Sequence, residues 1–162
     1  MSQFVHLHLH SEFSLADGIL KVKDLVRQTA ALDMPAVALT DINNLFALVK
    51  FYETCTGQGV KALLGCELMI ESDGSGPPER IVLLAMNAAG YANLRVLVSK
   101  AYTDTDERGV LSEAAVFARG DGLIVLSGGI RGHLWSMCEQ KNTQALKDRI
   151  QKWRQVFGTR YY

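Results

Sequence analysis

Cysteine is scarce in this chain and is not arranged as a framework. Cys55, Cys66 and Cys138 are the only cysteines among 162 residues, and no two of them have the CxxC spacing. An odd number without that spacing argues against a disulfide scaffold and against a zinc knuckle. This use of cysteine is typical of a reducing compartment, so we expect a cytoplasmic protein.

Long apolar runs and an excess of one charge are also absent. No apolar stretch approaches about eighteen residues, and no basic segment followed by an apolar run opens the chain, so we expect neither a membrane span nor a signal peptide. The 17 basic and 17 acidic residues cancel. A neutral balance argues against a domain whose main task is to grip a phosphate backbone, although a neutral module within a larger nucleic-acid machine stays open.

Apolar residues make up 48% of the chain, enough for one folded domain with a core, and their spacing predicts alternating strands and helices. Strands are predicted over residues 5–11, 36–40, 60–70, 80–86 and 122–127. Helices are predicted over 22–32, 45–56, 91–102, 112–119, 133–140 and 143–157, with loops over 72–79 and 103–109. This order indicates an α/β fold with a parallel sheet and outer helices, either doubly wound or closed as a barrel. The aromatic segment 157–162 begins a further strand, which predicts a fragment of a longer chain.

Three histidines lie in the first predicted strand. His6, His8 and His10 alternate with apolar residues, so a strand would place all three on one face, where imidazoles converge on one cation. Asp17 follows in a polar turn just beyond. The alternative is that the imidazoles lie on a half-buried strand and bond to backbone carbonyls. Three histidines in register favour the metal site over this alternative.

Further nitrogen and oxygen donors follow the predicted strands. In parallel α/β folds, ligands bind at the carboxyl ends of the strands. The residues at those ends are His8, His10, Asp17, Asp41, Asn44 and Glu67. Singly, Asp41 is more often a turn residue and Glu67 a paired carboxylate. Together they are typical of a divalent hydrolytic metal site.

Several short motifs in colinear order carry a resemblance to a known family. They are His8–Ser11, Leu15–Gly18, Ala38–Asp41, Gly65–Glu67 and Leu126–Gly128, joined by Leu48–Tyr52, Gly90–Leu94 and Ser99–Tyr102. The chain resembles the PHP (polymerase and histidinol phosphatase) domain. From Phe4 to Tyr162 it is most similar to the form at the amino terminus of bacterial replicative DNA polymerase III alpha subunits. The resemblance implies a distorted (β/α)7 barrel with parallel strands and outer helices. Residues 1–162 would supply its truncated first part, with the remaining barrel and polymerase regions beyond.

The resemblance also implies a ligand set for a trinuclear metal cluster. Four residues match ligand positions of the metal-binding members: His8, His10, Asp17 and Glu67. Three other positions depart, because Ile42 and Arg80 stand where the family has histidines and Gly129 stands where it has a cysteine. His133, at a predicted helix start, is not expected to replace a missing ligand.

The three departures predict that the cluster is dismantled. Isoleucine cannot coordinate a metal, and an arginine guanidinium is a fixed cation that repels one. Arg80 would instead pair with Asp17 or Glu67. We therefore expect no catalytic residue and no cofactor in this chain, while a single weak Zn²⁺ at His8 and His10 stays open.

The family membership so implied defines two functional hypotheses. In the first, the chain is the PHP domain of a template-directed DNA polymerase whose Mg²⁺-dependent nucleotidyl transfer takes place elsewhere in the parent protein. The domain is then a structural module that docks a proofreading exonuclease subunit and meets DNA only through the parent. In the alternative, it is an active metal-dependent 3′–5′ exonuclease or a small phosphatase.

Overall fold

The computed structural model describes residues 4–71, 76–103 and 109–162. They belong to two compact units, Met1–Cys66 and Glu67–Tyr162. Strand β2 (Lys61–Ile70) begins in the first unit and continues into the second. Parts of the predicted loops, residues 72–75 and 104–108, lie outside the described residues.

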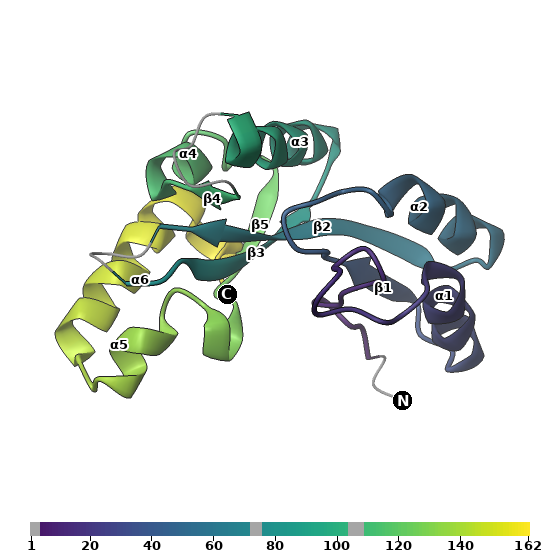
Figure 1. Cartoon of the computed structure of the whole chain (residues 1–162), viewed down its shortest axis with the longest axis horizontal. Coiled ribbons are helices and arrows are strands. Elements are labelled where there is room, and N and C mark those ends of the chain that lie inside the picture. The colour runs from purple at the N-terminus through teal and green to yellow at the C-terminus, as the bar shows by residue number, and fades with distance from the viewer. Residues whose placement is uncertain (1–3, 72–75, 104–108) are drawn as a thin grey trace. The chain divides into compact units, whose positions relative to one another are not determined.

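The first unit contains two helices and a parallel strand pair (Figure 1). Helix α1 (Val22–Ala31) buries one face, packs on strand β1 and contacts helix α2 (Leu48–Gly57). The buried residues of that face are Val22, Leu25, Val26 and Thr29. All four residues of β1 (Ala36–Leu39) are buried, as expected for a continuously apolar strand covered on both faces. The strand pairs with β2 in parallel, from Ala36 opposite Lys61 to Leu39 opposite Leu64.

The prediction of a regular strand over residues 5–11 is wrong. The segment has no strand assignment, although it follows β1: Ala38 N–H donates to His6 O at 2.8 Å and Thr40 N–H to Leu9 O at 2.9 Å. The Thr40 hydroxyl accepts from Leu9 N–H at 2.9 Å and donates to Leu9 O at 3.0 Å. A side chain thus replaces part of the backbone ladder. Leu7 is 41% exposed, so the expected alternation of buried and exposed residues is lost as well.

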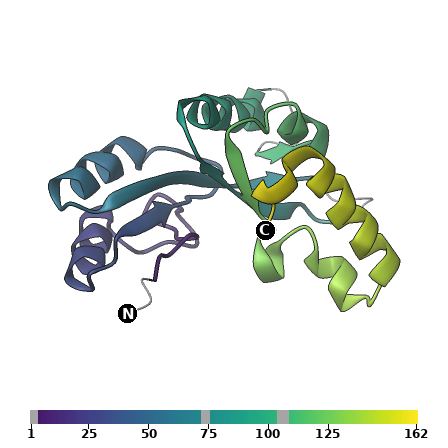
Figure 2. The same ribbon diagram turned by 180° about the vertical axis from the view of Figure 1, so that it is seen from behind.

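The second unit holds the remaining elements. Its helices are α3 (Ala88–Thr103), α4 (Glu113–Phe117), α5 (Trp135–Glu139) and α6 (Thr143–Phe157), with 3-10 turns at Gly129–Arg131 and Gly158–Arg160. Its further strands are β3 (Glu79–Ala85), β4 (Val110–Leu111) and β5 (Leu123–Leu126). Ser112 caps α4, because its hydroxyl accepts from Ala115 N–H. In the view of Figure 2, α6 (yellow) lies on the near side of the strands of this unit, and it contacts α5.

The strands of the described residues form an open five-stranded sheet, so the α/β class is confirmed. The strand order is β1-β2-β3-β5, and β4 pairs in parallel with β2. The expectation of uniformly parallel strands is wrong, because β3 and β5 are antiparallel, from Val82 opposite Leu126 to Ala85 opposite Leu123. Apolar runs predict strands but carry no information about strand direction, and the connection over residues 86–122 is long enough to return the chain in either direction. The described strands do not close into a barrel.

The core of the second unit is aromatic. Trp153 stacks on Phe157 with ring centroids 5.6 Å apart, and Phe117 meets Trp153 edge-on at 4.9 Å. Tyr161, in the predicted terminal strand, forms one isolated parallel bridge with Val125. Helix α6 is thereby fixed to β5 through side chains and through the segment that follows it.

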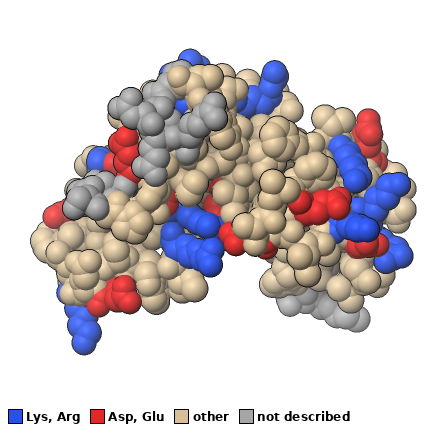
Figure 3. Space-filling view, in the orientation of Figure 1, with Lys and Arg blue, Asp and Glu red and all other residues tan. Residues whose placement is uncertain are grey.

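Basic and acidic side chains are interspersed on the face that Figure 3 shows, in keeping with the zero net charge of the sequence. Within the described parts of the chain, no helix has the length and apolar character that crossing a bilayer requires.

Candidate metal centre

A buried carboxylate organises the turn after β1. Asp41 is 3% exposed and accepts three hydrogen bonds of 2.7 Å, from Ser11 N–H, from the Ser11 hydroxyl and from the Ser14 hydroxyl. The Ser14 hydroxyl also accepts from Ile42 N–H at 3.1 Å. Asp41, which sequence reasoning counted among the candidate donors, is therefore turned to the serines of the 11–18 loop.

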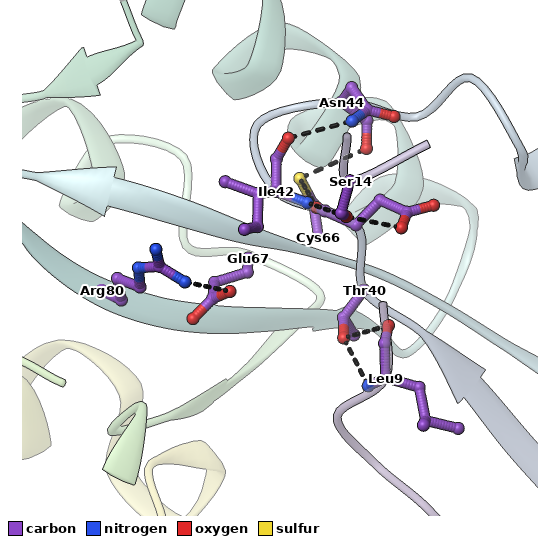
Figure 4. A network of polar contacts seen from close by, with 9 residues as sticks. Leu9, Ser14, Thr40, Ile42, Asn44, Cys66, Glu67 and Arg80 are labelled. Carbon is purple, nitrogen blue, oxygen red and sulfur yellow. Dashed lines mark hydrogen bonds and ion pairs between the residues drawn. The ribbon is translucent and has the colours of Figure 1, made fainter. Parts of the chain in front are cut away.

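Other contacts hold the same loop (Figure 4). The Asn44 amide donates to Phe13 O at 3.1 Å and to Ile42 O at 2.9 Å, and the Cys66 thiol donates to Asp41 O at 3.1 Å. Gly18 approaches so closely that a Cβ there would lie 1.9 Å from Ser11 O. The loop is thus fixed at both ends by residues of the first unit.

His8, His10 and Asp17 line one hollow of the first unit. The two imidazole centroids are 5.0 Å apart and the rings meet edge to face. Leu9, Gly18, Ile19 and Leu20 complete the lining of a hollow of about 350 Å³. His8, His10 and Asp17 therefore line the same hollow even though the segment that carries the histidines is not a regular strand, and their role as metal ligands stays a prediction.

Glu67, on β2, is 1% exposed and is paired with Arg80 on β3. Arg80 Nη1 lies 3.3 Å from Glu67 Oε2, and the arginine side chain is 19% exposed. The expectation that Arg80 pairs with a predicted metal ligand is confirmed for Glu67. A buried carboxylate needs such a partner, since an isolated buried charge is strongly unfavourable.

Three of the four predicted ligands can contribute to one donor set. One ligand atom from each of His8, His10 and Glu67 lies within 4.8 Å of the others. Strand β2 joins Glu67 directly to Cys66, the last residue of the first unit. Two imidazoles and a carboxylate are the donors of many zinc sites. Asp17 lines the hollow but is not part of this set.

The positions that depart from the family pattern do not extend the donor set. Ile42 offers an apolar side chain at the end of β1, and Gly129 offers none. Gly129 has φ +62°, which a cysteine adopts only with strain, although no atom lies within 4 Å of a Cβ built there. The residues present therefore fit a single ion with three donors and do not fit a cluster of ions.

Sequence reasoning missed a second buried polar network. Arg149 is 3% exposed; its Nη2 lies 3.0 Å from Glu79 Oε2 and its Nε lies 3.0 Å from Glu113 Oε1. Trp153 Nε1–H donates to the same Glu113 oxygen at 2.7 Å, and Lys152 pairs with the other. The signal was present, because Arg149, Trp153 and the next buried residue of α6 are spaced four apart on one helical face.

His133 is a core residue of the second unit. It is fully buried, its Nε2 lies 2.8 Å from the Tyr161 hydroxyl, and its ring meets Trp153 at 4.5 Å. Burial raises the pKa of Tyr161 to about 12, so the hydroxyl keeps its proton at neutral pH. The expectation that His133 does not act as a substitute ligand agrees with this position.

Comparison with known proteins gives one family. The sequence model of the PHP domain matches residues 6–162. The DNA polymerase III subunit alpha of Pseudomonas aeruginosa is 42% identical over 165 residues, covering 98% of this chain and 14% of the relative. The corresponding subunits of Vibrio cholerae and Escherichia coli K12 are 40% and 36% identical, each covering 99% of this chain and 14% of the relative. The chain thus spans about a seventh of the length of these curated relatives.

A solved structure supports the fold. The structure described as a putative metal-dependent phosphoesterase from Bifidobacterium adolescentis superposes with a TM-score of 0.55 at 15% identity, covering 78% of this chain and 66% of the other. The sequence match over nearly the whole length and the shared architecture agree. The chain belongs to the PHP domain family.

Proposed function

We propose that the chain is the PHP portion of a replicative DNA polymerase alpha subunit and that its contribution to DNA synthesis is structural. The identity to three DNA polymerase III alpha subunits over 98–99% of the chain supports this proposal. Nucleotidyl transfer, with its Mg²⁺ ions and its DNA, would take place in other parts of a much longer cytoplasmic protein.

The ion pair between Arg80 and Glu67 is the observation that carries the structural role. A guanidinium cannot lose its proton in a protein, so Arg80 brings a permanent positive charge to the only carboxylate of the three-donor set. Two unit charges 4 Å apart repel by about 4 kcal/mol at an effective dielectric of 20, and a divalent ion doubles this. Arg80 thus competes with a metal for Glu67. The site keeps its charge balance without a cation, and at most one weakly held Zn²⁺ remains.

A domain that has lost its metal cluster cannot remove a misincorporated nucleotide by metal-dependent hydrolysis. Proofreading would then come from a separate exonuclease subunit that docks on the domain. This partner follows from the proposed loss of hydrolysis and from the similarity to replicative polymerase subunits.

Metal binding tests the proposal directly. We expect wild-type protein to hold far less than one equivalent of Zn²⁺ after dialysis, and Arg80→Gln to bind Zn²⁺ at least about tenfold more tightly because the competing charge is gone. Arg119→Gln, which removes an exposed arginine of the same unit, is the matched control and should leave zinc binding unchanged. Isothermal titration calorimetry and elemental analysis measure both quantities.

Near-stoichiometric occupancy of two or three ions in the wild type would refute the structural role. A restored ligand set, Arg80→His with Ile42→His and Gly129→Cys, extends the test. The third substitution places a cysteine at φ +62° and is expected to lower stability by about 1 to 2 kcal/mol. The double variant without it is therefore measured alongside.

A second candidate function is an active metal-dependent phosphoesterase. It is favoured by the three donors within 4.8 Å and by the hollow beside the histidines. A bound metal would supply water activation and neutralise charge on the phosphoryl group. Release of nucleotides from single-stranded DNA indicates a nuclease, and release of phosphate from histidinol phosphate indicates a phosphatase. Either activity must disappear in His8→Ala to be assigned to this site.

A further inference from the structure

Asp41 lies beside the candidate metal centre without belonging to its donor set. Both of its carboxylate oxygens accept hydrogen bonds of 2.7 Å from Ser11 or Ser14, and its backbone carbonyl accepts from the Cys66 thiol. A carboxylate engaged in this way has its lone pairs directed at the loop. The side chain is also 3% exposed, so bulk water does not compete for these bonds.

The contacts of Asp41 and its neighbour Thr40 fall on either side of the predicted ligands. Thr40 binds the backbone of Leu9, which lies between His8 and His10. Ser11, bound twice by Asp41, follows His10 directly, and Ser14 lies three residues before Asp17. Two consecutive residues at the end of β1 therefore hold the histidine segment and the loop that carries the carboxylate.

The histidine segment needs contacts other than a backbone ladder to hold it in place. Because residues 4–10 do not form a regular ladder with β1, backbone pairing alone does not fix where the imidazoles lie. Short hydrogen bonds that a carboxylate accepts are stronger than bonds between neutral groups. In metal sites, partners that hold the ligands without touching the metal typically change its affinity ten- to hundredfold.

We propose that Asp41 is a positioning residue, which clamps the 11–18 loop so that His8, His10 and Asp17 share one hollow, and that it does not ligate metal itself. This inference rests on the proposed function only in identifying the hollow as the remnant of a metal centre. The clamp itself is a property of the first unit and can be measured without any metal.

The test compares Asp41→Ala, which removes the clamp, with Asp41→Asn, which keeps one carbonyl acceptor and the side-chain shape. Amide hydrogen exchange reports the clamp at two donors, the N–H groups of Ser11 and Ile42, and reports general opening at Phe51, whose N–H bonds to Ala47 O in helix α2. Asp24→Ala, an acidic residue at the surface of α1, is the matched control.

We expect Asp41→Ala to raise amide exchange at Ser11 and Ile42 at least about tenfold, with little change at Phe51. Asp41→Asn should restore much of the protection at Ser11 and Ile42. Asp24→Ala should leave exchange unchanged at all three residues. Unchanged exchange at Ser11 and Ile42 in Asp41→Ala would overturn the inference, and so would an equal rise at Phe51, which indicates a merely structural role. If Asp41→Ala does not fold, Asp41→Asn is compared with the wild type instead. We then expect a smaller rise in amide exchange at Ser11 and Ile42, again without a rise at Phe51.

Zinc titration separates this inference from the proposed function. If the wild type binds Zn²⁺, Asp41→Ala should weaken binding roughly ten- to hundredfold, and unchanged affinity would count against the positioning role. If the wild type binds none, the residual zinc site is refuted, and the exchange data alone decide whether Asp41 is the clamp.

Discussion

Both units of the chain bury a charged side chain where segments distant in sequence meet, but they neutralise it differently. In the first unit, the carboxylate of Asp41 is bound by hydroxyls and a backbone N–H. In the second, the guanidinium of Arg149 is held between two carboxylates, those of Glu79 and Glu113. Each charged side chain is about 3% exposed.

The difference matters because Asp41 holds a loop beside the candidate metal centre, whereas Arg149 joins a helix to the core of its unit. In the loop held by Asp41, Asp17 is exposed and lines the hollow together with His8 and His10. Arg149 lies next to the aromatic core and ties helix α6 to β3 and α4. Hydroxyl donors can be exchanged at modest cost, whereas removing one partner of a buried ion pair leaves charges uncompensated.

The largest effect is therefore expected in the second unit. Arg149→Met keeps the apolar stem of the side chain but leaves Glu79 and Glu113 without the guanidinium, and we expect it to lower the free energy of unfolding by about 3 to 5 kcal/mol. Arg154→Met, at an exposed position of the same helix, should change it by less than about 0.5 kcal/mol. Urea denaturation measures both. A loss below 1 kcal/mol for Arg149→Met would show that the two networks do not differ as described.

A smaller loss is expected from crowding the loop of the first unit. Gly18→Ala places a Cβ 1.9 Å from Ser11 O, so the backbone must move, and we expect a loss of about 2 to 3 kcal/mol. Gly57→Ala, at the end of α2 with no atom within 4 Å of the new Cβ, should be neutral or stabilising by about 0.5 kcal/mol. Thermal unfolding compares the pair. Equal melting temperatures would mean that the loop is not fixed against Asp41 as tightly as the contacts indicate.

The smallest effect concerns the hydroxyl that meets His133. Tyr161→Phe removes one buried hydrogen bond and should cost about 1 kcal/mol near neutral pH. Burial raises the pKa of Tyr161 from 10.0 to about 12, which favours the protonated form in the folded chain. Its contribution is thus fully present below pH 10 and is lost as the pH rises through about 12. Unfolding free energies from pH 8 to 12 should fall less steeply for Tyr161→Phe than for the wild type, and parallel curves would contradict this linkage.

Much of the fold was predictable because the apolar periodicity is local. The helix α1, the strand β1 and the bounds of α6 follow from residues a few positions apart, and the structure confirms them. The sequence also led us to expect that Arg80 pairs with Asp17 or Glu67, because a fixed cation stands at a ligand position, and the structure shows Glu67 as the partner.

The predictions that were wrong or missed depend on contacts between distant residues, which a local sequence pattern does not reveal. Alternating histidines and apolar residues predicted a strand, but the Thr40 hydroxyl takes the place of part of the ladder. Strand direction depends on connection length and on which neighbour is reached, and β3 and β5 proved antiparallel. The ion pairs of Arg149 were missed because both of its carboxylate partners lie at least 36 positions away in the sequence.

By itself, the sequence determined the α/β class and most element bounds, and it identified His8, His10, Asp17 and Glu67 as candidate donors. These depend on residue chemistry and short-range periodicity. Only the tertiary structure decided that Asp41 turns to the serines, that Glu67 is engaged by Arg80, and that Arg149 is buried. A charge is stable in a folded protein only beside groups that satisfy it, and those groups are brought together by the fold.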